Sequence, residues 1–165
     1  MSDRSDSGAT LRHQLREALA SPHAHATLEQ ALAGVPPHLR GAKAPGQPHT
    51  LWRLLEHLRI AQWDILEFSR RAGHESPKWP EGYWPEGDAP ADDDAWGRSI
   101  SAFHADLADF ESLVADEQRD LFERFPWGDG QTLLREVLLL ADHNGYHIGQ
   151  MVLLRQLLGI WPPSK

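Results

Sequence analysis

Cysteine is absent from the 165 residues of this chain. Its absence excludes disulfide bonds, a thiol nucleophile, and zinc or iron–sulfur sites that use cysteine ligands. Any metal ion that the chain holds must therefore bind nitrogen or oxygen atoms.

Long hydrophobic runs are also missing. The longest apolar run, Val137–Ala141, is far too short to span a bilayer. The N-terminal residues Met1–Ser7 are polar and lack the apolar stretch of a secretory signal. We therefore expect a cytoplasmic protein that has no membrane partner.

Positive charge is scarce relative to negative charge. The 16 lysine and arginine residues are outnumbered by 24 aspartate and glutamate residues, which gives a formal net charge of -8. The basic residues are scattered along the chain, and a negatively charged protein repels phosphate backbones. The sequence therefore predicts no nucleic-acid partner.

The length fits one ordinary globular domain, and neither a change in composition nor an internal repeat divides it. We expect a single domain over residues 1–165, with residues 1–9 as a flexible N-terminal segment.

Apolar residues recur at helical spacing in four segments, and no segment has the alternating pattern of a strand. The predicted helices span Thr10–Ala33, His49–Arg71, Ala95–Ala115 and Thr132–Leu158. Ser21-Pro22 is expected to break the first of them and restart it as a second segment, which gives a kinked helix. Four long amphipathic helices bury their apolar faces most simply against one another, so we expect an all-α four-helix bundle. Long links between the helices predict a crossover connection.

Polar residues precede two of these helices. Thr50 is expected to act as the N-cap of the second helix, and Asp92–Asp94 are expected to cap the third. Between these helices, residues 73–90 combine four prolines with Trp79, Tyr83 and Trp84, which predicts an ordered loop. This loop either walls a cleft or only seals the outside of the bundle.

Two histidines lie four residues apart in the last predicted helix, in the motif His143-Asn-Gly-Tyr-His147. This spacing places both rings on one helical face, the face that also carries the leucines expected to be buried. Buried imidazoles need hydrogen bonds, water or a metal ion. We interpret the pair as metal ligands, and the alternative is that both are core histidines with ordinary hydrogen bonds.

A third ligand is expected from another helix. His57 lies on the apolar face of the second predicted helix, whereas His104 on the third is the competing candidate. The remaining histidines, in the first predicted helix, at helix ends or in loops, are expected at the surface: His13, His23, His25, His38, His49 and His74.

Three stretches of the chain carry a family resemblance. They are Leu54-Leu-Glu-His-Leu-Arg-Ile-Ala-Gln-Trp-Asp64, Pro77-Lys-Trp-Pro-Glu-Gly-Tyr-Trp-Pro85, and Asp142-His-Asn-Gly-Tyr-His-Ile-Gly-Gln150 followed by Gly159-Ile-Trp-Pro-Pro163. Together they resemble the DinB-like superfamily, which includes the YfiT-like metal-dependent hydrolases. Nothing in the chain resembles the error-prone DNA polymerase that shares the name.

The resemblance implies a four-helix bundle with a long crossover, commonly dimeric, that holds a divalent metal through three histidines. The matching positions are His57, His143 and His147, and all three are histidine here. Zinc or nickel is the expected ion, and iron or manganese also suits a three-histidine site.

Three neutral imidazoles leave one metal position open to water, whose pKa a zinc ion lowers to about 7. No glutamate follows His143, so the mechanism of the zinc proteases is not expected. Gln150, one turn beyond His147, and Asp64 are candidate supporting residues, and Asp142 is a weaker one.

Two classes of function remain open. The first is a metal-dependent enzyme acting on an unidentified small molecule, either a hydrolase or a thiol-dependent transferase. A transferase using an anionic thiol should place arginines near the site, and Arg53 and Arg59 are the candidates. The second is a non-catalytic, metal-stabilised dimeric bundle that serves as a binding or stress-response module. Seven tryptophans, several in segments expected to be exposed, favour a homodimer in either case.

Overall fold

Helices make up the regular structure of this chain, whose computed structural model describes residues 2–20 and 24–162. The long helices are α1 (Ser2–Ala20), α3 (Leu51–Arg70), α4 (Ala95–Ala115) and α5 (Leu133–Leu157). A short helix, α2 (Leu28–Leu32), and two 3-10 turns, η1 (Pro37–Leu39) and η2 (Glu81–Tyr83), lie in the connections. Within the described ranges there is no strand, and the prediction of an all-α fold is confirmed. None of these helices is both long and apolar enough to cross a membrane.

Local sequence signals set the ends of α3 and α5. The hydroxyl of Thr50 accepts a hydrogen bond from the backbone N–H of Arg53 at 3.1 Å, which confirms Thr50 as the N-cap of α3. Thr132 caps α5 in the same way through the N–H of Arg135, at 3.2 Å. Gly159 follows α5 with a φ of 72°, a left-handed conformation that glycine adopts without a steric penalty.

The boundaries predicted for the first helix are wrong. The structure has two helices here, and α1 begins at Ser2 rather than at Thr10. Ahead of α2, Thr27 and Gln30 form a capping box, in which each side chain accepts the backbone N–H of the other residue. This capping box starts a separate helix instead of continuing the first one. The kink expected at Ser21-Pro22 lies outside the described residues.

The acidic run before α4 caps it differently from the prediction. The side chain of Asp94, at the N-cap position, makes no capping hydrogen bond. Asp92 instead accepts the backbone N–H of Asp94 at 3.0 Å and pairs with Arg98 at 2.8 Å. Asp92, which precedes α4, therefore stabilises the first turn of the helix through these two contacts.

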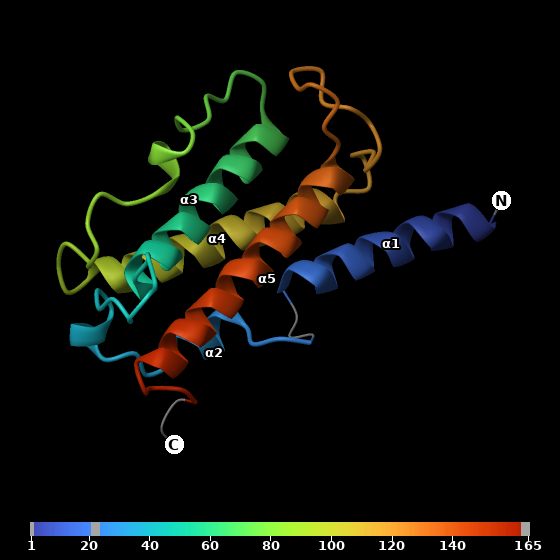
Figure 1. The fold of residues 1–165 in the computed structure, drawn as a ribbon. Coiled ribbons are helices and arrows are strands. Elements are labelled where there is room, and N and C mark those ends of the chain that lie inside the picture. The colour runs from blue at the N-terminus through green and yellow to red at the C-terminus, as the bar shows by residue number, and fades with distance from the viewer. Residues whose placement is uncertain (1, 21–23, 163–165) are drawn as a thin grey trace.

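The four long helices form a closed set of neighbours. Helix α3 packs against α4 and α5, and α1 packs against the same two helices. Figure 1 shows that α3 and α4 run in one direction while α1 and α5 run in the other. Each long helix can therefore bury its apolar face against two others.

The buried apolar side chains fall into two clusters along the length of the helices. The first cluster includes α3 residues from Leu51 to Leu58 and α5 residues from Ile148 to Leu154. The second includes Leu66 of α3 and the α5 residues Leu133 to Leu140. The segment of α5 from His143 to His147 lies between them, so a polar layer separates the two halves of the core.

The segment 71–94 joins α3 to α4 by running back along α3, as Figure 1 shows. Its contacts reach progressively earlier residues of α3 as the segment advances. They are His74 Nε2 to Asp64 Oδ1 at 2.7 Å, Tyr83 O to His57 Nδ1 at 2.8 Å, Pro85 O to Arg53 Nη1 at 2.9 Å, and Asp88 O to Thr50 Oγ1 at 2.6 Å. This path brings η2 and Trp84 beside the middle of α3.

Arg155 joins α5 to the surrounding connections. Arg155 is 1 % exposed. Its guanidinium donates hydrogen bonds to the carbonyl oxygens of Gln30, Ala31 and Ile160 at 2.8–3.1 Å. Removing this charged donor would leave the carbonyl oxygens without a partner, which would lower the stability of the fold. Arg155 therefore anchors both α2 and the residues that follow α5.

Replacing Arg155 with methionine should lower the free energy of unfolding by about 2 to 4 kcal/mol, because one buried and two part-buried hydrogen bonds to carbonyl oxygens are lost. Urea denaturation measures this change. Arg98→Met is the matched control, since it removes an exposed ion pair that contributes about 1 kcal/mol or less. Equal losses in the two variants would contradict the anchoring role of Arg155.

Candidate metal centre

Three histidines meet where α3 faces α5, in the polar layer between the two apolar clusters. His57 comes from α3, and His143 and His147 come from consecutive turns of α5. The Nε2 atom of His57 lies 3.1 Å from Nε2 of His147 and 3.1 Å from Nε2 of His143. One ring nitrogen of each residue lies within 4.8 Å of those of the other two. The structure therefore brings together the three residues that the sequence predicted as ligands.

His104, the competing candidate from the sequence, is not part of this cluster. It lies on α4, where its Nε2 atom is 3.3 Å from a carboxylate oxygen of Glu29. Among the described residues, no other group of histidine, aspartate and glutamate side chains has the spacing of a metal site.

The spacing of the ring nitrogens suits a small divalent ion. Zinc–nitrogen bonds of about 2.0–2.1 Å in a tetrahedral site put two ligand nitrogens roughly 3.3 Å apart. The observed separations of 3.1 Å are close to this value. An ion could therefore sit against all three rings with little movement of the helices.

The hydrogen bond of His57 to Tyr83 determines which nitrogen of the His57 ring carries hydrogen. Its Nδ1 atom lies 2.8 Å from the carbonyl oxygen of Tyr83, which can only accept. In a neutral ring the hydrogen is therefore on Nδ1, and Nε2 presents a lone pair to the other histidines.

His147 is oriented in the same way. Its Nδ1 atom lies 2.7 Å from Oε1 of Gln150, so the amide oxygen accepts the ring hydrogen. Gln150 in turn donates from Nε2 to the hydroxyl of Tyr146 at 3.2 Å. This contact supports the predicted role of Gln150, because hydrogen bonds of this kind orient metal-binding imidazoles.

Burial keeps the rings neutral. His57 is 4 % exposed and His147 is 9 % exposed. The pKa of His57 is lowered to about 4, mainly by burial, with smaller lowering contributions from His147 and His49 and an opposing effect of the Tyr83 carbonyl. Burial also lowers the pKa of His143 to about 4, with contributions from His147 and His57. Neutral imidazole is the form that binds metal ions.

Trp84 covers the outer face of His57. The two rings stack with centroids 4.0 Å apart and planes within 3° of each other. The opposite face of Trp84 stacks on His49, again at 4.0 Å. The loop predicted over residues 73–90 therefore contacts a candidate ligand directly, and His49, which the sequence placed at the surface, is half-buried beside the site.

Asp64 supports the site from a distance. It accepts a hydrogen bond from the Tyr83 hydroxyl at 2.6 Å and pairs with His74 at 2.7 Å. Burial first, and then the Asp64 carboxylate, raise the pKa of Tyr83 to about 12, so the phenol stays protonated and keeps donating. Asp64 thereby holds the residue whose carbonyl oxygen orients His57. The prediction that His74 lies at the surface is wrong, because its side chain is 3 % exposed.

The remaining candidate positions lie away from the cluster. Asp142 is exposed to solvent, as are His13, His25 and His38, whereas His23 lies outside the described residues. Arg59 is engaged by both oxygens of Glu56 at 2.8 and 2.9 Å. Arg53 donates to the Pro85 carbonyl and lies over the ring of Trp84. Arg59 is therefore paired with a carboxylate, whereas Arg53 has a carbonyl partner and lies 3.8 Å from the Asp88 carboxylate.

Comparison of the chain with protein-family models, with curated proteins and with solved structures found no match. The interpretation of this site therefore depends on its geometry.

Trp84→Ala should weaken the binding of acetohydroxamate to the cobalt-loaded chain by about three- to tenfold, because an aromatic wall beside the site is lost. The visible spectrum of cobalt reports this binding. Trp79→Ala is the control, since Trp79 lies in the same segment but is 72 % exposed. An unchanged ligand affinity together with a large drop in melting temperature would show that Trp84 only contributes to packing.

Proposed function

We propose that this chain binds one divalent metal ion through His57, His143 and His147 and acts as a metal-dependent hydrolase of the DinB-like kind on a small molecule. The observation that carries the proposal is the 3.1 Å approach of the Nε2 atoms of His57 and His147. Each of these rings has an acceptor on Nδ1, so each directs a lone pair at the other.

Facing lone pairs repel unless a positive charge lies between them. A proton shared by the two Nε2 atoms would require an imidazolium ion, and burial opposes that charge on His57. A divalent cation removes the repulsion while leaving every ring neutral. Metal binding is thus the simplest physical reason for placing the Nε2 atoms of His143 and His147 this close to Nε2 of His57 inside the protein.

The family assignment extends to the fold. We propose that α1, α3, α4 and α5 form the four-helix bundle of the DinB-like superfamily and that segment 71–94 is its crossover connection. The closed set of helix contacts supports the bundle, and the contacts of the segment along α3 support the crossover.

A bound ion of this kind would supply Lewis acidity and bring the pKa of a coordinated water toward about 7. The chain provides orienting groups around that position. The hydroxyl of Tyr146 accepts a hydrogen bond from Gln150 and keeps its own hydrogen available for a substrate oxygen.

The surroundings favour hydrolysis over transfer to an anionic thiol. A thiol-dependent transferase needs a cationic pocket, whereas Arg59 is neutralised by Glu56 and Arg53 is held by Pro85 and Trp84. Asn144 follows His143 where a zinc protease carries its glutamate base, and its amide faces Gln62. The reaction therefore differs from that of the zinc proteases. Zinc and nickel suit the three nitrogens best, and iron or manganese would also be accepted.

We also propose that the chain forms a homodimer, and the exposed face of α5 supports this assembly. Leu138, Leu153 and Leu157 are exposed and lie within an arc of roughly 100° on that helix. The tryptophans that suggested dimerisation from the sequence contribute less, because only Trp79 and Trp127 are exposed in the described chain. The same face favours the second candidate function, a non-catalytic dimer that the metal stabilises.

Elemental analysis tests the metal assignment on protein purified without a metal-affinity tag. We expect about one equivalent of metal in the wild-type chain and a loss of most of it in His57→Ala, His143→Ala and His147→Ala, because each removes one of three ligands. His104→Ala is the control and should retain its metal. Full occupancy in all three ligand variants would contradict the site.

Sedimentation velocity tests the dimer. The wild-type chain should sediment as a dimer at micromolar concentration, and the double change Leu153→Glu and Leu157→Glu should yield monomers by placing charge in the apolar face. Phe122→Glu, at an exposed residue outside α5, should remain dimeric. A wild-type chain that sediments only as a monomer would remove the partner from the proposal.

A further inference from the structure

Two buried amide side chains cross the core beside the histidines. Gln62 of α3 is 0 % exposed, and Asn144 of α5 is 7 % exposed. Nε2 of Gln62 donates to the carbonyl oxygen of Phe103 on α4 at 2.6 Å, and Nδ2 of Asn144 donates to Oε1 of Gln62 at 3.2 Å. These bonds connect three helices in the polar layer of the core.

The Phe103 carbonyl fixes the orientation of both amides. A carbonyl oxygen only accepts, so Gln62 must direct its NH2 group toward Phe103 and its oxygen toward Asn144. Asn144 must then direct its NH2 group toward Gln62. Its Oδ1 atom is left as a hydrogen-bond acceptor that cannot exchange places with the nitrogen.

A donor without a partner lies on the adjacent residue. Nδ1 of His143 and Oδ1 of Asn144 are both buried, and neither has a hydrogen-bond partner in the structure. Water reaches neither atom. Buried polar atoms of this kind are rare because each one loses its hydrogen bonds to solvent. Adjacent side chains of a helix point about 100° apart, so the two atoms can pair only if the His143 ring carries its hydrogen on Nδ1 and turns toward Asn144.

We propose that Asn144 is a positioning residue of the metal centre, whose Oδ1 atom accepts the Nδ1 hydrogen of His143 and directs Nε2 of that ring toward the ion. The inference rests on the proposed metal site, because a ring that binds the ion through Nε2 must carry its hydrogen on Nδ1. All three ligands then have an acceptor: the Tyr83 carbonyl for His57, Gln150 for His147 and Asn144 for His143.

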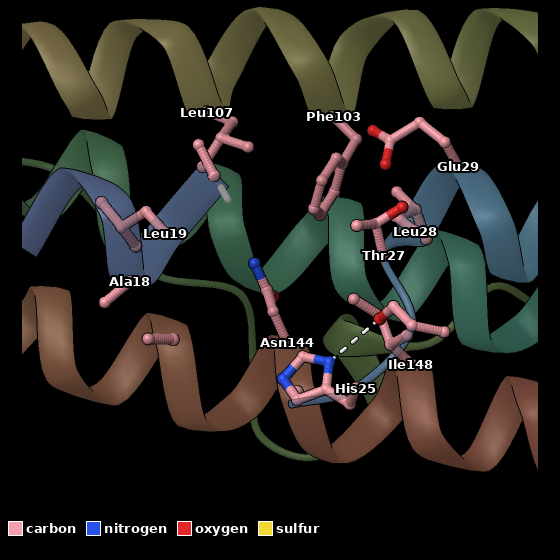
Figure 2. Close-up of a pocket in the computed structure, with 14 residues that line it drawn as sticks. Ala18, Leu19, His25, Thr27, Leu28, Glu29, Phe103, Leu107, Asn144 and Ile148 are labelled. Carbon is pink, nitrogen blue, oxygen red and sulfur yellow. Dashed lines mark hydrogen bonds between the residues drawn. The ribbon is translucent and has the colours of Figure 1, made fainter. Parts of the chain in front are cut away.

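The surroundings of Asn144 agree with this role. Burial lowers the pKa of His143, and the amide of Asn144 acts in the opposite direction and raises it. Figure 2 shows the Asn144 side chain leaving α5 and pointing across the interior, with Phe103 and Leu107 opposite. It lies at the wall of a cavity of about 60 Å³ between α1, α2, α4 and α5. This cavity gives a slightly larger side chain at position 144 room to fit.

The chain of contacts has a functional consequence. It runs from the backbone of α4 through Gln62 to Asn144, and the proposed bond extends it to His143 on α5. The rotation of the His143 ring is thereby tied to the packing of α4, although α4 contributes no ligand. This dependence distinguishes a positioning residue from an amide that only fills the core.

Two substitutions separate the acceptor from the bulk of the side chain. Asn144→Leu removes the acceptor and keeps the approximate size, and we expect zinc affinity, measured by competition with a chelator, to fall about 10- to 100-fold. Asn144→Asp keeps an oxygen acceptor and loses the donor to Gln62, so its affinity should stay within about threefold of the wild-type value. Gln62→Met breaks the same chain of contacts one residue earlier and should lower zinc affinity by a smaller factor, about three- to tenfold. Val137→Ala, a buried change in the second apolar cluster, is the packing control and should lower the melting temperature while zinc affinity stays within about threefold of the wild-type value.

Imidazole NMR of the zinc-loaded wild-type chain gives a readout that packing alone does not produce. We expect the His143 hydrogen to be on Nδ1 and to exchange slowly with solvent, and that protection should disappear in Asn144→Leu. Wild-type zinc affinity in Asn144→Leu, or a rapidly exchanging Nδ1 hydrogen in the wild-type chain, would overturn this inference alone. A wild-type chain that binds no zinc would overturn the proposed metal site and the inference with it.

Discussion

The structure depends on keeping three uncharged imidazoles together in the middle of a helical core. His57 and His147 direct lone pairs at each other across 3.1 Å, and hydrogen bonds to Tyr83 and Gln150 hold both rings in that orientation. The apolar clusters lie on either side of this layer, and burial opposes charge on the rings. A cation between the rings would remove the repulsion of the facing lone pairs while leaving each ring neutral.

The segment between α3 and α4 is as important to this arrangement as the helices. It supplies the carbonyl oxygen that fixes the tautomer of His57 and the indole of Trp84 that covers the same ring. Asp64 fastens the segment through the hydroxyl of Tyr83. A connection with only one short 3-10 turn thus sets the orientation of a candidate ligand that a helix carries.

Helical periodicity carried most of the information available from the sequence. The four-residue spacing of His143 and His147 predicted a shared face, and the apolar face of α3 made His57 a candidate. Periodicity left His104 as a competitor, and the family resemblance favoured His57. Periodicity says nothing about contacts between distant segments. The stacking of His49 on Trp84 and the burial of His74 were missed because the sequence has no signal for the path of the segment along α3. The sequence predicted a second segment after Ser21-Pro22, but it did not predict that this segment is a separate short helix starting at Leu28. Its capping box is local, but the leucines around it continue the spacing of α1.

X-ray absorption spectroscopy of the chain loaded with zinc or nickel tests the central claim most directly, because it counts the imidazoles around the ion. The account predicts three imidazole nitrogens and at least one further light atom from solvent at about 2.0–2.1 Å for zinc. The three imidazoles are those of His57, His143 and His147. A spectrum of an ion surrounded by water or carboxylate oxygens, without the scattering pattern of imidazole rings, would contradict the account.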